Sequence, residues 1–231
     1  MRLAVIPARG GSKRILNKNI RYFCGKPIIA YSIEKARQSG LFDDVVVSTD
    51  STIIAEIALR CGAGVPFMRP KDLATDKIHP FSAVSHAIRF FEEKGITLES
   101  ICCIYATAPL MRVGDLIKGH EALTENKFDF VMAVTTYDFP VYRSLRLCDD
   151  VIVPEFRDTI NERSQDLPEL VRDCGQFYWG SSEAFHQNDT VFRHPHIRAA
   201  GVSVPKKYVQ DIDTEEDWEE AEIRYRILNN V

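Results

Sequence analysis

The chain opens with a short apolar run, Leu3-Ala4-Val5-Ile6, which leads directly into Pro7-Ala8-Arg9-Gly10-Gly11-Ser12-Lys13-Arg14-Ile15-Leu16-Asn17-Lys18. An apolar run of this length is typical of a fully buried strand. The segment behind it contains two glycines, a serine and four cationic side chains. A polyphosphate requires exposed backbone N–H groups, close approach of the backbone and positive charge. The segment therefore predicts a nucleotide-binding loop that follows a first strand.

Two better-known phosphate motifs do not fit this loop. A P-loop needs four residues between its first glycine and a Gly-Lys-Ser/Thr, and the dinucleotide fingerprint needs Gly-x-Gly-x-x-Gly. The sequence Gly10-Gly11-Ser12-Lys13-Arg14 satisfies neither pattern, which disfavours a P-loop or NAD-binding protein. The simpler alternative is a glycine turn with solvated cations, because short motifs also occur by chance.

Composition restricts the class of protein further. The 231 residues, of which 45% are hydrophobic and 27% charged, are typical of one large soluble domain or of a domain with an insertion. A net charge of −4 disfavours nucleic-acid partners, which need a basic surface. We find no apolar stretch of transmembrane length and no signal-peptide pattern, so we expect no membrane partner and a cytoplasmic location. The six cysteines lack Cys-x-x-Cys spacing, which favours free thiols.

Short apolar runs alternate with helical patterns along the chain, and this alternation predicts an α/β fold with a mostly parallel sheet and helices on both faces. The predicted strands span 3–6, 44–49, 65–67, 101–105, 128–134, 176–179 and 200–204. The predicted helices span 51–61, 81–94, 113–125 and 213–228, the last with Trp218, Ala221, Ile223 and Ile227 facing inward.

The alternation stops between about Thr136 and Asp173. This stretch contains Pro140, Pro154 and Pro168 and several arginines, and it is too long for a plain loop in a compact domain. We interpret residues 136–173 as an insertion that contacts a partner subunit, within a single domain over 1–231.

Several polar segments follow predicted strands: 7–19, 48–50, 106–109 and the residues after Val204. Ligands of open α/β sheets bind beyond the carboxyl ends of the strands. These segments are therefore expected to meet around one site.

Taken in order, the chain resembles the cytidylyltransferases that make CMP-activated nine-carbon acidic sugars. The matching pieces extend over nearly the whole chain, and it is their ordered occurrence that is specific. They are 6–14, Lys18-Asn19, 23–27, 46–50, Arg69-Pro70, 73–76, 106–110, 163–167, 175–180 and 211–214. Two of them, Ser164-Gln165-Asp166-Leu167 and Gly175-Gln176-Phe177-Tyr178-Trp179-Gly180, favour pseudaminic acid over N-acetylneuraminic acid as the sugar.

The resemblance implies a Rossmann-like fold with an inserted dimerisation segment, and an Mg²⁺-dependent, homodimeric enzyme. Its reaction would transfer CMP from CTP to the anomeric hydroxyl of a nonulosonic acid and release pyrophosphate. The alternatives are an N-acylneuraminate or legionaminate cytidylyltransferase, and a sugar-nucleotide-binding regulator without turnover. Arg9, Lys18 and Asp211 are the catalytic candidates.

By the same resemblance, nine residues are candidates for binding the nucleotide. Ala8 and Arg9 would frame the cytosine through the backbone, and Asn19 and Arg69 would reach the base or ribose. Gly10, Gly11 and Ser12 would let the backbone fold around the triphosphate. Lys18, with Arg9 or Lys13, would offset its charge.

Asp211 and Asp213 are the candidates for holding the metal ion. At a predicted strand end, two residues apart, their carboxylates would face one side, and Mg²⁺ commonly takes one or two carboxylates with waters and phosphate oxygens. The alternative is structural, because Asp213-Thr214-Glu215-Glu216 also resembles a helix N-cap followed by an acidic third position. The resemblance favours the metal-binding role over the capping role for Asp213.

Tyr105, Arg163, Arg172, Gln176 and Tyr178 are the candidates for binding the sugar. Arginine suits a carboxylate because its planar guanidinium binds in a bidentate manner, and Arg143 or Arg163 could serve a neighbouring subunit's site. The aromatic residues could equally be sheet core. The segment 77–81 and Met111 depart from the family pattern, so we assign no role to His79 or Arg112.

Overall fold

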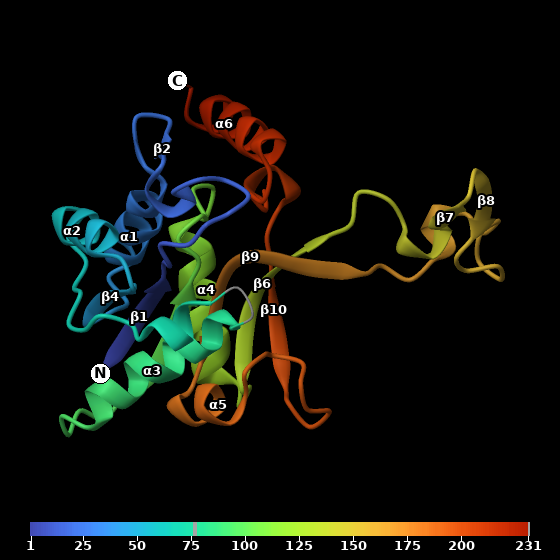
Figure 1. Cartoon of the computed structure of the whole chain (residues 1–231). Coiled ribbons are helices and arrows are strands. Elements are labelled where there is room, and N and C mark those ends of the chain that lie inside the picture. The colour runs from blue at the N-terminus through green and yellow to red at the C-terminus, as the bar shows by residue number, and fades with distance from the viewer. Residues whose placement is uncertain (76–77, 231) are drawn as a thin grey trace.

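The computed structural model describes residues 1–75 and 78–230. At its centre lies a six-stranded sheet with the strand order β10-β6-β9-β5-β1-β4, and two further strand pairs, β2–β3 and β7–β8, lie outside it (Figure 1). The central strands are β1 (Arg2–Pro7), β4 (Asp44–Ser48), β5 (Ser100–Ile104), β6 (Phe130–Thr136), β9 (Val171–Gly180) and β10 (Ala199–Ser203). The outer strands are β2 (Tyr22–Phe23), β3 (Lys26–Pro27), β7 (Leu145–Cys148) and β8 (Val151–Pro154).

The central sheet is mixed. Strand β1 pairs in parallel with β4 and β5, and β10 pairs in parallel with β6. Strand β9 lies between β5 and β6 and is antiparallel to both. The predicted mostly parallel sheet is confirmed, and β9 is the one antiparallel member of this sheet. As a result, the carboxyl ends of the parallel strands and the start of β9 share one edge of the sheet.

The helices of the described chain agree with all four predicted helices and include two more that the pattern did not indicate. The α-helices are α1 (Ile28–Gln38), α2 (Thr52–Arg60), α3 (Pro80–Glu92), α4 (Val113–Glu125), α5 (Ser182–Gln187) and α6 (Glu215–Asn229). Short 3-10 helices are η1 (Lys18–Ile20), η2 (Lys71–Ala74), η3 (Val141–Arg143), η4 (Ser164–Asp166) and η5 (Lys206–Tyr208). Helices α1 and α5 were not predicted.

The strand predicted at 65–67 is wrong. This region forms only an isolated bridge between Val46 and Gly64. Pro66 lacks an N–H group and so cannot donate to a ladder at that point.

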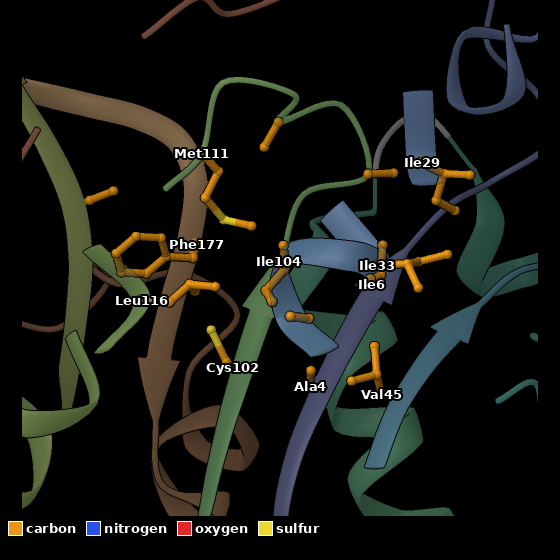
Figure 2. Close-up of a cluster of buried hydrophobic side chains, with 14 of the residues drawn as sticks. Ala4, Ile6, Ile29, Ile33, Val45, Cys102, Ile104, Met111, Leu116 and Phe177 are labelled. Carbon is orange, nitrogen blue, oxygen red and sulfur yellow. The ribbon is translucent and has the colours of Figure 1, made fainter. Parts of the chain in front are cut away.

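Side chains alternate between the two faces of the sheet, and helices cover both faces. One core cluster joins strand residues such as Ala4, Ile6 and Ile104 to α1, α2 and α4 (Figure 2). The other joins Leu3 and Val5 to α3 and α5, through residues that include Phe81 and Phe185. The predicted arrangement of helices on both faces is therefore confirmed.

Helix α6 packs on a third, smaller cluster that includes Ile15, Phe23 and Ile212. Trp218 and Ala221 are buried, as predicted, but Ile223 and Ile227 are 55% and 71% exposed. These two residues follow Trp218 by five and nine positions, which at about 100° per residue turns them to the far side of the helix. The prediction that they face inward is wrong.

The segment between β6 and β9 leaves the sheet and projects from it as an arm (Figure 1). We use "the arm" for residues 137–170. It carries η3, the β7–β8 hairpin and η4. Large apolar side chains on the arm are exposed: Tyr137, Phe139, Leu145, Leu147, Val151, Ile152, Phe156 and Leu170.

The six cysteines are free thiols, as predicted. Among the described helices, none combines the length and apolar character that would be needed to cross a membrane.

Candidate active site

The loop after β1 is held against the end of β4. The Ala8 N–H donates to the Ser48 carbonyl at 2.9 Å, and the Gly10 N–H donates to Asp50 Oδ1 at 2.9 Å. A Cβ at Gly10 would lie 3.1 Å from the Ser51 Cβ, so glycine permits this close approach. Gly11, by contrast, faces open space.

A cavity of about 290 Å³ opens beside this loop. It is bounded by the loop, by Arg69 and the η2 region, and by residues that follow β5. The lining residues are Pro7, Arg9, Ser12, Lys13, Arg14, Ile15, Lys18, Asn19, Arg69, Leu73, Thr75, Ile78, Pro80, Tyr105, Ala106 and Thr107. Six of the nine predicted nucleotide-binding residues thus line one cavity, and Ala8, Gly10 and Gly11 supply the adjoining backbone.

Asn19 and Arg69 are buried at this cavity. The Asn19 side-chain amide donates to the Arg9 carbonyl at 2.9 Å, and an Arg69 Nη donates to the Ser48 carbonyl at 2.9 Å. Burial lowers the pKa of Arg69, although the nearby Asp50 opposes this shift. Arg69 Nε has no hydrogen-bond partner among the described residues. A buried donor without a partner is costly, so this N–H is available to a ligand in the cavity.

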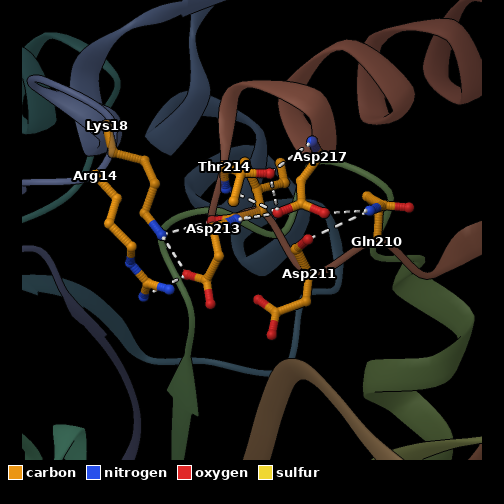
Figure 3. A network of polar contacts seen from close by, with 8 residues as sticks. Arg14, Lys18, Gln210, Asp211, Asp213, Thr214 and Asp217 are labelled. Atoms are coloured by element: carbon orange, nitrogen blue, oxygen red, sulfur yellow. Dashed lines mark hydrogen bonds and ion pairs between the residues drawn. The ribbon is translucent and has the colours of Figure 1, made fainter. Parts of the chain in front are cut away.

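The loop after β1 meets the segment before α6, far away in the sequence. Lys18 Nζ donates to the Ile212 carbonyl at 2.6 Å and lies 3.4 Å from Asp213 Oδ1 (Figure 3). Arg14 lies 2.8 Å from the same carboxylate oxygen. The predicted convergence of these two regions is therefore present.

Asp213 does not cap helix α6. Thr214 is the N-cap: its hydroxyl accepts from the Asp217 N–H at 3.2 Å, and the Asp217 carboxylate accepts from the Thr214 N–H at 2.8 Å. The alternative role for Asp213 is wrong because Thr214 and Asp217 form the complete capping box.

The predicted strand end at Asp211 and Asp213 is also wrong, because both residues lie in the loop between η5 and α6. Ile212 between them is buried in the small cluster. Its neighbours on either side therefore face away from that cluster, and both carboxylates point away from α6 (Figure 3).

The electrostatic environment of Asp211 suits an added cation. Partial desolvation raises the pKa of Asp211, the negative charge of Asp213 raises it further, and Lys18 opposes the shift. Within the described residues, no basic side chain forms an ion pair with Asp211, and no group of three or more acidic, histidine or cysteine side chains is arranged to hold a metal. Two carboxylates thus fit Mg²⁺ only if water and phosphate oxygens complete its ligands.

The predicted sugar-binding residues fall in four places. Tyr105 lines the main cavity. Gln176 and Tyr178 are buried, and the ring of Tyr178 lies 5.4 Å from that of Tyr105. Arg172 lines a neighbouring polar cavity together with Asp211, and Arg163 is on the arm, where its Nε lies 2.8 Å from Asp166.

His79 and Arg112, to which we assigned no role, have structural ones. His79 is the N-cap of α3, where its Nδ1 accepts from the Phe81 N–H at 3.4 Å. Arg112 forms a bidentate pair with the buried Asp115, at 2.7 and 2.8 Å, and its guanidinium lies over the ring of Tyr208. In the segment 77–81, Lys77 lies outside the described residues.

Sequence reasoning missed two residues of this region. Arg14 belongs to the cationic loop that was singled out, so its charge was the available signal. Asp173 binds Tyr178, and no motif indicated it, because a bulge in β9 creates the contact.

A charged cavity at the carboxyl edge of a mostly parallel α/β sheet is typical of nucleotide-binding domains. Comparison with known proteins narrows this class. The family model described as "Cytidylyltransferase" matches residues 3–224. The chain belongs to the cytidylyltransferase family.

Among curated relatives, a pseudaminic acid cytidylyltransferase from Campylobacter jejuni is 42% identical, over 97% of this chain and 96% of the relative. A CMP-N,N'-diacetyllegionaminic acid synthase from Legionella pneumophila is 31% identical, over 94% and 92%. A solved structure of CMP:2-keto-3-deoxy-manno-octonic acid synthetase complexed with CTP has a TM-score of 0.70 over 100% of this chain and 99% of that one. At 14% identity, this last comparison bears on the fold alone.

Proposed function

We propose that this cytidylyltransferase transfers CMP from CTP to the anomeric hydroxyl of pseudaminic acid and releases pyrophosphate. The observation that carries the choice of sugar is the 42% identity to a pseudaminic acid enzyme over 97% of the chain, compared with 31% to a legionaminic acid enzyme. Legionaminic and N-acylneuraminic acids are the alternative substrates.

The main cavity is the proposed CTP site. Arg69, buried with an unpartnered Nε, and Asn19, whose amide is held by the Arg9 carbonyl, suit the base or ribose. The backbone of Ala8 and Arg9 borders the same pocket. Gly10, Gly11 and Ser12 supply backbone that can approach the triphosphate, and Lys13 and Lys18 add positive charge.

In the proposed reaction, the anomeric oxygen forms a bond to the α-phosphorus while the bond to the β-phosphate oxygen breaks. Such transfers depend on positioning and charge neutralisation more than on covalent catalysis. Arg9 and Lys18 would hold the phosphates in line and offset the charge that develops on the leaving pyrophosphate. Lys18 is well placed for this, because the Ile212 carbonyl already orients its ammonium group.

Asp211 and Asp213 are the proposed Mg²⁺ ligands. When bound, the ion would neutralise phosphate charge and help to orient the triphosphate. Asp213 would have to share its carboxylate with Arg14 and Lys18, which lie 2.8 and 3.4 Å away in this structure. Asp211 has no such partner among the described residues, so it is the more available ligand.

The sugar is proposed to bind between Tyr105 and the cavity that contains Arg172. Tyr105 would form a wall, with Tyr178 behind it and Gln176 held by the Tyr208 carbonyl at 2.7 Å. Arg172 lines the same cavity as Asp211, so it could bind the sugar carboxylate close to the metal site.

The arm is proposed to mediate a homodimer. Its β7–β8 hairpin pairs Leu147 with Ile152, and these side chains are 70% and 63% exposed. Burying such an apolar patch against a second copy would stabilise a dimer. Arg163, on the same arm, would then serve the site of the neighbouring subunit.

The test of the function is incubation with CTP, Mg²⁺ and a panel of pseudaminic, legionaminic and N-acetylneuraminic acids, with mass detection of the products. CMP-pseudaminic acid should form fastest. Faster formation of another CMP-sugar would reassign the substrate. CTP-dependent heat stabilisation without any product would instead support a non-catalytic nucleotide-binding regulator. A cytoplasmic location, where CTP is available, is part of the proposal.

A further inference from the structure

Strand β9 contains a bulge at the edge of the sheet where the candidate site lies. Met132 and Val134 are two positions apart on β6, whereas their partners on β9, Tyr178 and Asp173, are five positions apart. Three additional residues therefore bow out of β9 at this point. Gly175, within the bulge, has a φ of +61°, a conformation that favours glycine.

Asp173 closes this bulge with two hydrogen bonds. Its Oδ1 accepts from the Gly175 N–H at 2.7 Å, and its Oδ2 accepts from the hydroxyl of Tyr178. The second contact joins an exposed carboxylate to a buried phenol. Hydrogen bonds to a charged acceptor are stronger than neutral ones, so Asp173 fixes Tyr178 in one orientation.

The ring of Tyr178 in turn supports the wall of the main cavity. Its centroid lies 5.4 Å from Tyr105, which lines the cavity, and 5.4 Å from Phe81 in the core below. Tyr105 is therefore held between the cavity and a phenol whose position Asp173 determines.

The bulge also lies between Tyr105 and Asp211. A Cβ at Gly175 would lie 3.8 Å from Tyr105 Cδ2 and 3.8 Å from Asp211 Oδ1. The backbone that Asp173 closes is thus the partition between Tyr105 and Asp211, and its shape sets the space between them.

We propose that Asp173 is a positioning residue that determines how the sugar acid is held. It acts through Tyr178 on Tyr105, and through Gly175 on the spacing between Tyr105 and Asp211. This inference rests on the proposed function, because it takes the region between Tyr105 and Asp211 as the place of the sugar.

The test compares D173N, Y178F and the double variant with the wild type. Y178F removes only the phenol hydroxyl, so it keeps the inference testable even if D173N folds poorly. Each single variant should raise the KM for the acid by about tenfold or more, while the Kd for CTP, measured by calorimetry, stays within about twofold. The double variant should be no worse than the more affected single variant, because both remove the same contact.

D43N is the matched control. Asp43 also accepts a backbone N–H, that of Arg2 at 2.6 Å, but lies at the opposite edge of the sheet. The D43N variant should leave the KM for the acid and the Kd for CTP unchanged. An unchanged KM for the acid in folded D173N and Y178F, or effects that multiply in the double variant, would overturn the inference.

A second measurement separates this inference from the proposed function. The orientation of the Tyr105 ring should change in crystals of Y178F, whichever acid is the substrate. If the wild type converts no acid, the proposed function fails, and the ring orientation still decides whether the Asp173–Tyr178 contact positions Tyr105. An unchanged orientation of the Tyr105 ring in Y178F would contradict the inference that the Asp173–Tyr178 contact positions Tyr105.

Discussion

The carboxyl edge of the sheet and the arm differ in the chemical character of their surfaces. At the edge, charged and polar side chains are partly or fully buried and held by hydrogen bonds to backbone carbonyls: Arg69 by Ser48, Asn19 by Arg9 and Lys18 by Ile212. On the arm, apolar side chains such as Leu147 and Ile152 are exposed on a two-stranded hairpin. A two-stranded hairpin has little stability on its own. These properties support the proposals that the edge binds a small charged ligand and that the arm contacts another protein surface.

The largest effect should come from the charged edge, at Lys18. K18A removes the ammonium group that reaches Ile212 and Asp213, and kcat/KM for CMP-sugar formation should fall by about 10²–10³-fold. A pyrophosphate-release assay measures this. K127A, which changes an exposed lysine just before β6, is the control and should behave as wild type. A fall of less than about threefold in K18A would remove Lys18 from the catalytic set.

Asp211 tests whether the acidic pair belongs to the same site. D211N should lower turnover by about 10²-fold and weaken its dependence on Mg²⁺, because a neutral amide is a poorer ligand for the ion. The measurement is turnover against Mg²⁺ concentration, with circular dichroism to show that folding is retained. Wild-type dependence on Mg²⁺ in D211N would show that the ion binds elsewhere.

A substitution on the arm tests whether its exposed apolar face mediates a homodimer. L147E places a charge on the exposed hairpin face and should raise the dissociation constant of a homodimer by about 30-fold or more. Analytical ultracentrifugation measures it. I227E is the matched control, since Ile227 is 71% exposed on α6, outside the arm. A wild type that is monomeric, or an equal effect in I227E, would contradict the role of the arm.

The smallest expected effect concerns pH. Burial lowers the pKa of His79, so the folded protein binds a proton there less readily than the unfolded chain does. Stability from this group is present above the unfolded pKa and is lost as the pH falls below about 6.5. H79N keeps a side chain that can cap α3 and does not titrate.

Between pH 7.5 and pH 5, the Tm of H79N should therefore fall less than that of the wild type, by up to about 3 °C. His86 and His120 also have pKa values lowered by burial and titrate in both proteins, so they serve as an internal reference. An equal or steeper fall in H79N would contradict the prediction, whereas a Tm lowered equally at both pH values would measure the difference in capping.

Local patterns predicted the elements that have one clear signal. The strand at 3–6 follows from its apolar run, the helix at 113–125 from its 3.6-residue spacing, and the cationic loop at 7–18 from its charge. Helix α1 was not predicted because the residues of its first half, Ile28 to Ser32, are all buried, and charged residues begin only at Glu34. Two of the four positions predicted to face inward on α6 are exposed, because the helix packs against the domain only along a narrow stripe around Trp218 and Ala221.

The sequence by itself determined most of the strands and helices, where positive charge gathers and which carboxylates stand in a pair, because these follow from neighbours along the chain. Only the tertiary structure decided that β9 runs antiparallel, that Thr214 rather than Asp213 caps α6, and that Asp173 reaches Tyr178. Those outcomes depend on which segments pack together and on the backbone conformation at single residues. Short-range pattern carries no information about either.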